Sequence, residues 1–247
     1  MGGKIYLVGI GPGNSENITP GALDRIKNAQ VIIGHKSCLN IIKTHLSGKE
    51  IVSDAMSPVE RAGLAVDKAL AGNDVVLISL GDPGIYAIAS TFFSYIKEQN
   101  IKIETEVVPG ITTASEAAAL LGSPMGHDFA VISLADMAAS WRATQNRLKC
   151  VAEGDFVIVI YNPVGKAGRR RINRAIDILK AYRKPSTPVG IVTMAATDGE
   201  KVQITSLRKL PDCDIDIDSI LIIGNARTFV FNGRMVTPRK YKQGVGY

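Results

Sequence analysis

Three short loops rich in glycine and proline follow apolar runs in the first half of the chain. They read GIGPGN over residues 9–14, GDPGIY over residues 81–86 and PGITTA over residues 109–114. If the apolar runs are strands of one parallel sheet, their carboxyl ends meet at the edge where open α/β folds bind ligands. We therefore predict that the three loops form a single binding site.

Few side chains in these loops can take part in chemistry. Asp82 is the only carboxylate in the three glycine and proline turns. It can accept hydrogen bonds from a ribose or an ammonium group, or it can cap the helix expected to follow. Thr112 and Thr113 stand at another expected helix start, where they can cap the helix or present hydroxyl groups to a ligand carboxylate. The sequence leaves both alternatives open.

The first loop does not match the dinucleotide fingerprint G-x-G-x-x-G. Asn14 takes the place of the third glycine, and Pro12 has no N–H to donate to a pyrophosphate. The second strand-like run is followed by His35 and Lys36 instead of a ribose-binding carboxylate. The phosphate-binding pattern G-x-x-x-x-G-K-[ST] is also absent. The remaining interpretations are a tight turn that needs glycine dihedral angles, or a loop that binds a different ligand.

The chain shows no pattern of a catalytic nucleophile or a metal site. The motifs G-x-S-x-G and H-E-x-x-H are absent, the three histidines are scattered, and the three cysteines form no C-x-x-C pair. We therefore predict no metal, no disulfide framework and no identifiable catalytic acid or base. A reaction that depends on positioning an already activated cofactor needs none of these groups.

The composition favours a globular protein with an anionic partner. The 247 residues carry a formal net charge of +6, with 46% hydrophobic residues. The basic run GKAGRRR over residues 165–171 is interpreted as a solvated loop and helix start in preference to an RNA-binding element. No apolar run approaches the roughly 20 residues of a membrane span, and the N-terminus lacks the pattern of a secretory signal. The expected location is the cytoplasm.

Alternating short apolar runs and longer helical patterns predict βαβ units and a mostly parallel sheet in the first half. The continuous apolar run over residues 75–80 is typical of a strand covered on both faces. Thr19 before Pro20, and Ser57 before Pro58, predict two helix N-caps. These elements would position the glycine loops.

The organisation predicted is that of an α/β protein with two domains, over residues 1–121 and 122–247. The boundary is placed where an alanine-rich helical stretch ends in a run containing two glycines and a proline, over residues 120–128. In the second half, Asn232 and Gly233 between apolar runs predict a β-hairpin. The N-terminal sheet is therefore expected to be mostly parallel and the C-terminal sheet mixed.

Taken in order, VGIGPG, GDPGIY and VVPGITTASEAAALL resemble the motifs of the tetrapyrrole methylase family. The resemblance extends over essentially the whole chain, through GSPMGHDFAVISLAD, DFVIVIYNP, PVGIVTMA and NGRMVTPRKY. The later motifs are similar to the branch that acts on precorrin-3B or cobalt-precorrin-3B. The resemblance implies S-adenosyl-L-methionine as cofactor, methylation of C17 with ring contraction in cobalamin biosynthesis, a cofactor cleft between two α/β domains, and a homodimer.

By motif position the resemblance also implies a set of cofactor contacts, several of them through backbone groups. These are Pro12, Leu80, Gly81, Asp82, Ile85, Thr112, Thr113, Asn162, Ala195 and Ala226. The substrate implied is a tetrapyrrole with many carboxylates, which suits the excess of Lys and Arg. Candidate substrate contacts stand in or near loops on the expected side: His35, Lys36, Met56, Arg61 and His127. The loop glycines are expected to let the backbone approach flat ligands, and neither nucleic acid nor a membrane is expected as a partner.

Two other functions remain open at this point. One is another methylase of the same fold, acting on uroporphyrinogen, diphthine precursors or ribosomal RNA, against which the later motifs argue. The other is a metabolite sensor without catalytic activity, whose support is the lack of an obvious acid or base.

Overall fold

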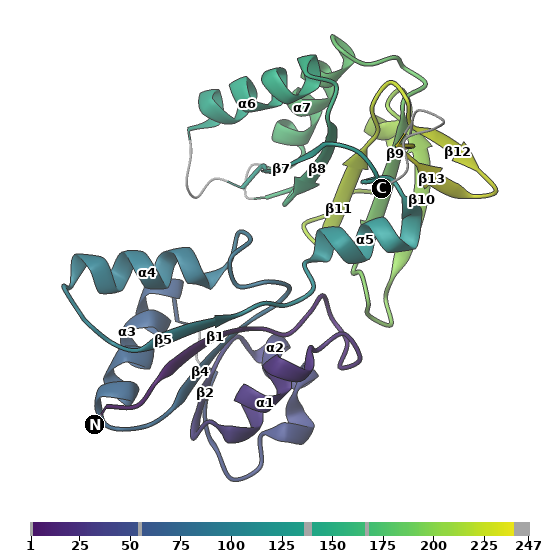
Figure 1. The fold of residues 1–247 in the computed structure, drawn as a ribbon. Helices are drawn as coiled ribbons and strands as arrows, with labels where there is room; N and C mark the ends of the chain where they lie inside the picture. Colours follow the sequence, from purple (N-terminus) through teal and green to yellow (C-terminus); the bar gives the residue numbers. More distant parts are fainter. Residues whose placement is uncertain (1, 54–55, 136–139, 166–167, 240–247) are drawn as a thin grey trace, which may run out of the picture. The chain divides into compact units, whose positions relative to one another are not determined.

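The chain forms two compact units, Met1–Thr113 and Ala114–Tyr247 (Figure 1). The structure is a computed structural model that describes residues 2–53, 56–135, 140–165 and 168–239. Each unit contains one five-stranded sheet flanked by helices. The predicted α/β class is therefore confirmed.

The sheet of the first unit is entirely parallel, as predicted, with strand order β3-β2-β4-β1-β5. Its strands are β1 (Ile5–Gly9), β2 (Val31–Ile33), β3 (Glu50–Val52), β4 (Val75–Ser79) and β5 (Thr105–Val108). Because β4, β1 and β5 are neighbours, the three loops that follow them leave the same edge of the sheet. Those are the three glycine loops.

Both faces of this sheet are covered by helices, which explains its continuous apolar strands. The helices are α1 (Pro20–Asn28), α2 (Lys36–Ile41), α3 (Pro58–Leu70) and α4 (Ile88–Glu98), with a 3₁₀ turn at Lys43–His45. Helices α3 and α4 cover one face and α1 and α2 the other (Figure 1). Alternate residues of β1 divide between the two cores: Ile5 and Leu7 pack with α3 and α4, whereas Val8 packs with α1 and α2. Because successive side chains of a strand point to opposite faces of the sheet, every second residue faces the same pair of helices.

The two predicted helix N-caps are confirmed. The Thr19 hydroxyl accepts a hydrogen bond from the Ala22 N–H at 3.2 Å. The Ser57 hydroxyl accepts from the Glu60 N–H at 3.2 Å, and a Glu60 carboxylate oxygen accepts from the Ser57 N–H at 2.6 Å. This reciprocal pair is a capping box, which satisfies N–H groups that the helix cannot pair internally. It fixes the point at which α3 begins after β3.

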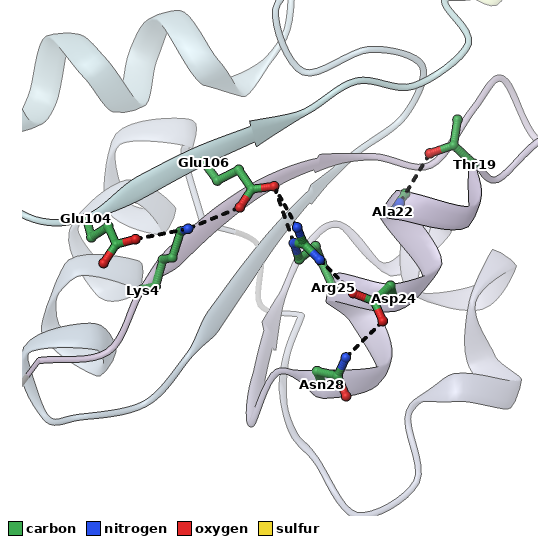
Figure 2. A network of polar contacts seen from close by, with 8 residues as sticks. All are labelled: Lys4, Thr19, Ala22, Asp24, Arg25, Asn28, Glu104 and Glu106. Carbon is green, nitrogen blue, oxygen red and sulfur yellow. Dashed lines mark hydrogen bonds and ion pairs between the residues drawn. The ribbon is translucent and has the colours of Figure 1, made fainter.

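An ion-pair network joins β1, β5 and α1 on one face of the sheet (Figure 2). Glu106 pairs with Lys4 at 3.1 Å and with Arg25 at 3.0 Å. Lys4 also pairs with Glu104 at 3.0 Å, and Arg25 with Asp24 at 2.6 Å. Hydrogen bonds from Arg25, and then from Lys4, hold the pKa of Glu106 below its ordinary value.

We expect Glu106→Gln to lower the free energy of unfolding at neutral pH but to change it little at acid pH. Because the pKa of Glu106 is lower in the folded chain, its contribution is present above the unfolded pKa and is lost as the pH falls through the folded pKa. Near pH 7 the variant should be less stable by about 1 kcal/mol, the scale of partly exposed ion pairs. Urea unfolding near neutral pH and at about pH 3.5 tests this, with the exposed Glu16→Gln as control. A deficit of the same size at both pH values would contradict it.

The sheet of the second unit is mixed, as predicted, with strand order β10-β9-β11-β8-β7. Its strands are β7 (Phe129–Ser133), β8 (Val157–Tyr161), β9 (Pro188–Thr193), β10 (Lys201–Ser206) and β11 (Ser219–Ile223). β7 and β8 are parallel, while β11 lies antiparallel between β8 and β9. Strand β10, which pairs antiparallel with β9, was not predicted because its residues are polar and largely exposed.

Helix α5 (Thr113–Leu121) explains where the two units divide. Its residues Ala114, Ala117 and Leu121 pack in one core with β8, β9 and β11. The helices α6 (Trp141–Glu153) and α7 (Arg170–Lys180) pack in the core on the other face of that sheet, together with a 3₁₀ turn at Leu210–Asp212. The division thus falls at the start of α5, between Thr113 and Ala114, whereas the sequence placed the domain boundary at the end of this helix.

The predicted hairpin is confirmed in a small three-stranded sheet. β12 (Phe229–Phe231) and β13 (Arg234–Val236) pair antiparallel, and β6 (Gly122–Ser123) pairs parallel with β13. The turn residues Asn232 and Gly233 have φ of 46° and 70°. Two successive positive φ angles are the requirement that favours Asn-Gly in tight hairpins.

No helix in the described part of the chain is long and apolar enough to cross a membrane.

Candidate functional site

The first two glycine loops are joined by direct backbone hydrogen bonds. The Gly81 N–H donates to the Gly11 carbonyl at 2.7 Å, and the Gly11 N–H donates to the Gly81 carbonyl at 3.3 Å. The backbone pairing of the neighbouring strands β1 and β4 therefore extends into the loops that follow them. The loop after β5 joins them through a side chain.

That side chain is Asp82. One carboxylate oxygen accepts a hydrogen bond from the Gly84 N–H at 2.8 Å, within its own loop. The other accepts from the Gly110 N–H at 3.1 Å, in the loop after β5. Helix α4 begins later, at Ile88, and its N-cap residue Ala87 makes no side-chain capping bond. Of the two roles left open by the sequence, helix capping is therefore wrong, and Asp82 holds two loops together.

The glycines at this junction are required by packing between loops. A Cβ atom on Gly9 would lie 2.5 Å from the Gly81 carbonyl oxygen and 2.7 Å from the Gly110 nitrogen. A Cβ atom on Gly110 would overlap the same Gly81 oxygen. Because the obstructing atoms belong to the backbone, no side-chain rotation relieves the clash. Backbone approach between the loops accounts for these glycines without a ligand.

The seven cofactor candidates of the first unit all lie at this loop edge: Pro12, Leu80, Gly81, Asp82, Ile85, Thr112 and Thr113. Pro12 and Gly81 are buried. Leu80 and Ile85 present apolar side chains that are 45% and 40% exposed. Exposed apolar groups beside hydroxyl groups and backbone N–H donors are the mixture found in sites for small organic ligands.

Four candidate substrate residues lie near the same edge, because they follow β2 and β3. His35 caps α2: its Nδ1 accepts from the Ser37 N–H at 3.3 Å, and Lys36 in the first turn is exposed. Met56 is half-buried before α3. Within α3, Arg61 has a buried Nε that lacks a hydrogen-bond partner among the described residues. An unsatisfied buried donor in a side chain of this kind is unusual.

The thiol of Cys38 in α2 lies within the electrostatic reach of Arg61. Burial raises the pKa of Cys38, and the positive charge of Arg61 acts in the opposite direction. Burial therefore keeps the Cys38 thiol in its neutral form near pH 7. Among the described residues, the Arg61 side chain thus keeps at least one donor, its Nε, without an acceptor.

In the second unit, Asn162 and Ala195 lie at one edge of the sheet. Asn162 follows β8, has φ of 50°, and donates through its side-chain amide to the Ser133 hydroxyl at 3.1 Å. Ala195 follows β9 and is 3% exposed. Since β8 and β9 run in the same direction, their carboxyl ends share an edge. The preceding residue Tyr161, which the sequence did not single out, accepts from the Ala114 N–H at 2.9 Å through its hydroxyl.

The structure does not bring Ala226 or His127 together with those two residues. Ala226 follows the antiparallel β11, so it lies beyond the amino ends of β8 and β9, where its N–H donates to Asp155 at 3.0 Å. His127 precedes β7 at that same opposite edge, and its Nδ1 accepts from the Asp128 N–H at 2.8 Å. Motif order along the chain carried no information on the direction of β11.

The surroundings of Ala226 have a structural explanation. Asp155 pairs with Arg183 at 3.2 Å, and the Arg183 side chain is only 3% exposed. Arg183 also donates to the carbonyl groups of Ala152 and Phe156 at the end of α6. Burial lowers the pKa of Arg183, while Asp155 acts to raise it. These contacts tie α6, β8 and the segment after α7 to one another.

The residues described include no group of three or more His, Cys, Asp or Glu side chains placed to hold a metal ion.

A parallel sheet with three interlocked glycine loops at its carboxyl edge, followed by a mixed-sheet unit, defines an α/β protein of two units. The family model of the Tetrapyrrole (Corrin/Porphyrin) Methylases matches residues 4–211. The chain therefore belongs to the tetrapyrrole methylase family, as its motifs predicted.

Two curated relatives and two solved structures give the range of similarity. The cobalt-factor III methyltransferase of Priestia megaterium is 38% identical over 98% of this chain, which spans 46% of that relative. The probable cobalt-factor III C(17)-methyltransferase of Salmonella typhimurium is 36% identical over 96% of this chain and 99% of its own. The methyltransferase CobJ has a TM-score of 0.89 at 29% identity, covering 96% of this chain and 100% of its own.

A uroporphyrin-III C-methyl transferase from Thermus thermophilus, solved with S-adenyl homocysteine, has a TM-score of 0.71 at 26% identity. That match covers 90% of this chain and 92% of the other.

Proposed function

We propose that this protein transfers a methyl group from S-adenosyl-L-methionine to C17 of precorrin-3B or its cobalt-containing counterpart, with ring contraction, in cobalamin biosynthesis. The observation that carries the proposal is the match over nearly the full chain to relatives named as cobalt-factor III C(17)-methyltransferases. The loop edge of the first unit supports it, because interlocked loops make a rigid platform for a cofactor.

The residues at this edge suit S-adenosyl-L-methionine. The exposed apolar side chains of Leu80 and Ile85 suit the adenine ring of the cofactor. The hydroxyl groups of Thr112 and Thr113 suit the polar amino acid end of the same molecule. The bound cofactor supplies a methyl group already activated by a sulfonium centre. The chain then has to hold donor and acceptor in line and exclude water, which requires no catalytic acid or base in the loops.

The basic groups near the edge suit the substrate. Lys36 and Arg61 follow β2 and β3, and the whole chain carries a net charge of +6. Positive charge attracts a polycarboxylate, and guanidinium groups bind carboxylates through paired hydrogen bonds. We also propose that the protein acts in the cytoplasm as a homodimer, without nucleic acid or a membrane as partner. Light scattering of the purified protein tests the dimer.

The proposal is tested by incubating the purified protein with methyl-labelled S-adenosyl-L-methionine and either precorrin-3B or cobalt-factor III. We expect the label in a tetrapyrrole whose mass has increased by one methyl group. Parallel incubations offer ribosomal RNA or uroporphyrinogen as the acceptor, and label transferred to either of these alone would instead identify another methylase of the same fold. Cofactor binding without any methylated product would identify a sensor, and either result would overturn the proposal.

A further inference from the structure

A basic pocket lies between α6 and α7 in the second unit. Its volume is about 450 Å³, and its lining residues are Trp141, Gln145, Arg170, Arg171 and Arg174. We call it the α6–α7 pocket. Three of its five described lining residues are arginines and none is a carboxylate, so the pocket is suited to a negatively charged ligand.

The α6–α7 pocket lies at the edge of the second sheet where strands β7, β8 and β9 have their carboxyl ends. Helix α6 follows β7 and α7 follows β8, so the first turns of both helices stand beyond the carboxyl ends of those strands. The guanidinium of Arg171 donates to the Leu134 carbonyl, just past β7, at 2.9 Å. This is the edge that carries Asn162 and Ala195, opposite the edge that carries Ala226.

The start of α7 is unfavourable for a helix that has no anionic ligand. Its N-cap residue Arg169 makes no side-chain capping bond, and its first turn contains no acidic residue. Arg170 and Arg171 instead place two cations at the positive end of the helix dipole, which costs stability. Local choices that oppose folding are expected at functional sites. Arg169, Arg170 and Arg171, at the described end of the basic run interpreted from the sequence as a solvated helix start, thus have a specific arrangement; Lys166 and Ala167 of that run lie outside the described residues.

One arginine of the pocket, Arg171, is fixed by contacts within the protein. The other two, Arg170 and Arg174, have guanidinium groups that can bind a ligand. The Arg171 guanidinium lies 5.1 Å from the centre of the Trp141 ring, a cation–π contact that orients both side chains. In the described part of the chain, Arg170 and Arg174 take part in no hydrogen bond or ion pair, and both are exposed. A flat indole surface beside two free guanidinium groups matches a flat ligand with carboxylates on its rim.

We propose that the α6–α7 pocket binds acidic side chains of the tetrapyrrole substrate, with Arg170 and Arg174 pairing with carboxylates and Trp141 contacting the macrocycle. This inference rests on the proposed function, since it names where that substrate is held. It makes Arg170 and Arg174 binding residues that set affinity for the tetrapyrrole and leave the affinity for the cofactor unchanged.

Equilibrium binding of uroporphyrin, a flat tetrapyrrole with carboxylate side chains, tests the assignment. Trp141 is the single tryptophan of the chain, so the quenching of its fluorescence follows binding. The double variant Arg170→Gln/Arg174→Gln is compared with Arg147→Gln/Arg208→Gln, which removes the same charge from exposed arginines outside the pocket. We expect the dissociation constant to rise about tenfold in the pocket variant and about twofold or less in the control.

Steady-state kinetics provide a second measurement. In the pocket variant the KM for the tetrapyrrole should rise, while kcat and the KM for S-adenosyl-L-methionine stay at their wild-type values. Uroporphyrin binding by the pocket variant equal to that of the control variant would overturn the inference. If uroporphyrin binding depends on the two arginines but the wild-type protein methylates no tetrapyrrole, the proposed function fails and the pocket remains a site for tetrapyrrole carboxylates.

Discussion

Gly110→Ala is expected to push the three glycine loops apart and to lower the free energy of unfolding by about 3 kcal/mol, the scale of a clash that cannot relax. The added methyl group would overlap the Gly81 carbonyl oxygen and approach the backbone of Gly9. It would also displace the Gly110 N–H from the Asp82 carboxylate. We therefore expect the variant to lose affinity for S-adenosyl-L-methionine together with stability.

A matched control is available in the helix that follows the first loop. Gly21 lies in α1, and a Cβ atom there would meet only a Val108 methyl group at 4.0 Å. Gly21→Ala should therefore keep the cofactor affinity and raise the stability by about 0.5 kcal/mol, because alanine is the better helix former. Urea unfolding and titration calorimetry measure both quantities. A Gly110→Ala variant with wild-type values for stability and affinity would show that the loops are not interlocked.

The first unit was largely predictable because its signals are local. The apolar runs, the N-caps at Thr19 and Ser57, and the loops after β1, β4 and β5 each depend on a few neighbouring residues. A parallel sheet then places all three loops at one edge without further information. The close packing of the loops could not be predicted from the sequence. The contact of Gly9 with Gly81 and Gly110 depends on the order of the strands in the sheet.

The second unit was less predictable because its site depends on strand direction. Asn162 and Ala195 share an edge, but Ala226 lies at the other because β11 runs antiparallel to β8 and β9. The polar pattern of β10 gave no strand signal. The extent of the first unit was missed for a related reason: the packing of Ala114 on the second sheet is a long-range contact.

Asp82→Ala is expected to weaken binding of S-adenosyl-L-methionine about tenfold or more, because it leaves the Gly84 and Gly110 N–H groups without their acceptor. Each lost hydrogen bond to a charged group costs about 1.5–3 kcal/mol when it cannot be replaced, and part of that cost is recovered by water at this half-buried position. The stability should therefore fall by about 2 kcal/mol. Asp214→Ala, at an exposed position in the other unit, serves as the control.

Asp82→Asn separates a positioning role from direct contact with the cofactor. Its single carbonyl oxygen can keep the bond from Gly84 or the bond from Gly110, while its amide group cannot accept the other. If Asp82 acts by holding the loops together, the asparagine variant should fall between wild type and Asp82→Ala in both stability and affinity. If the carboxylate instead binds the cofactor through its charge, the asparagine variant should lose as much affinity as the alanine variant while losing less stability. Measuring the stability and the cofactor affinity of Asp82→Asn and Asp82→Ala therefore decides between two roles of Asp82. One is the loop-joining role seen in the structure, and the other is direct contact with the cofactor.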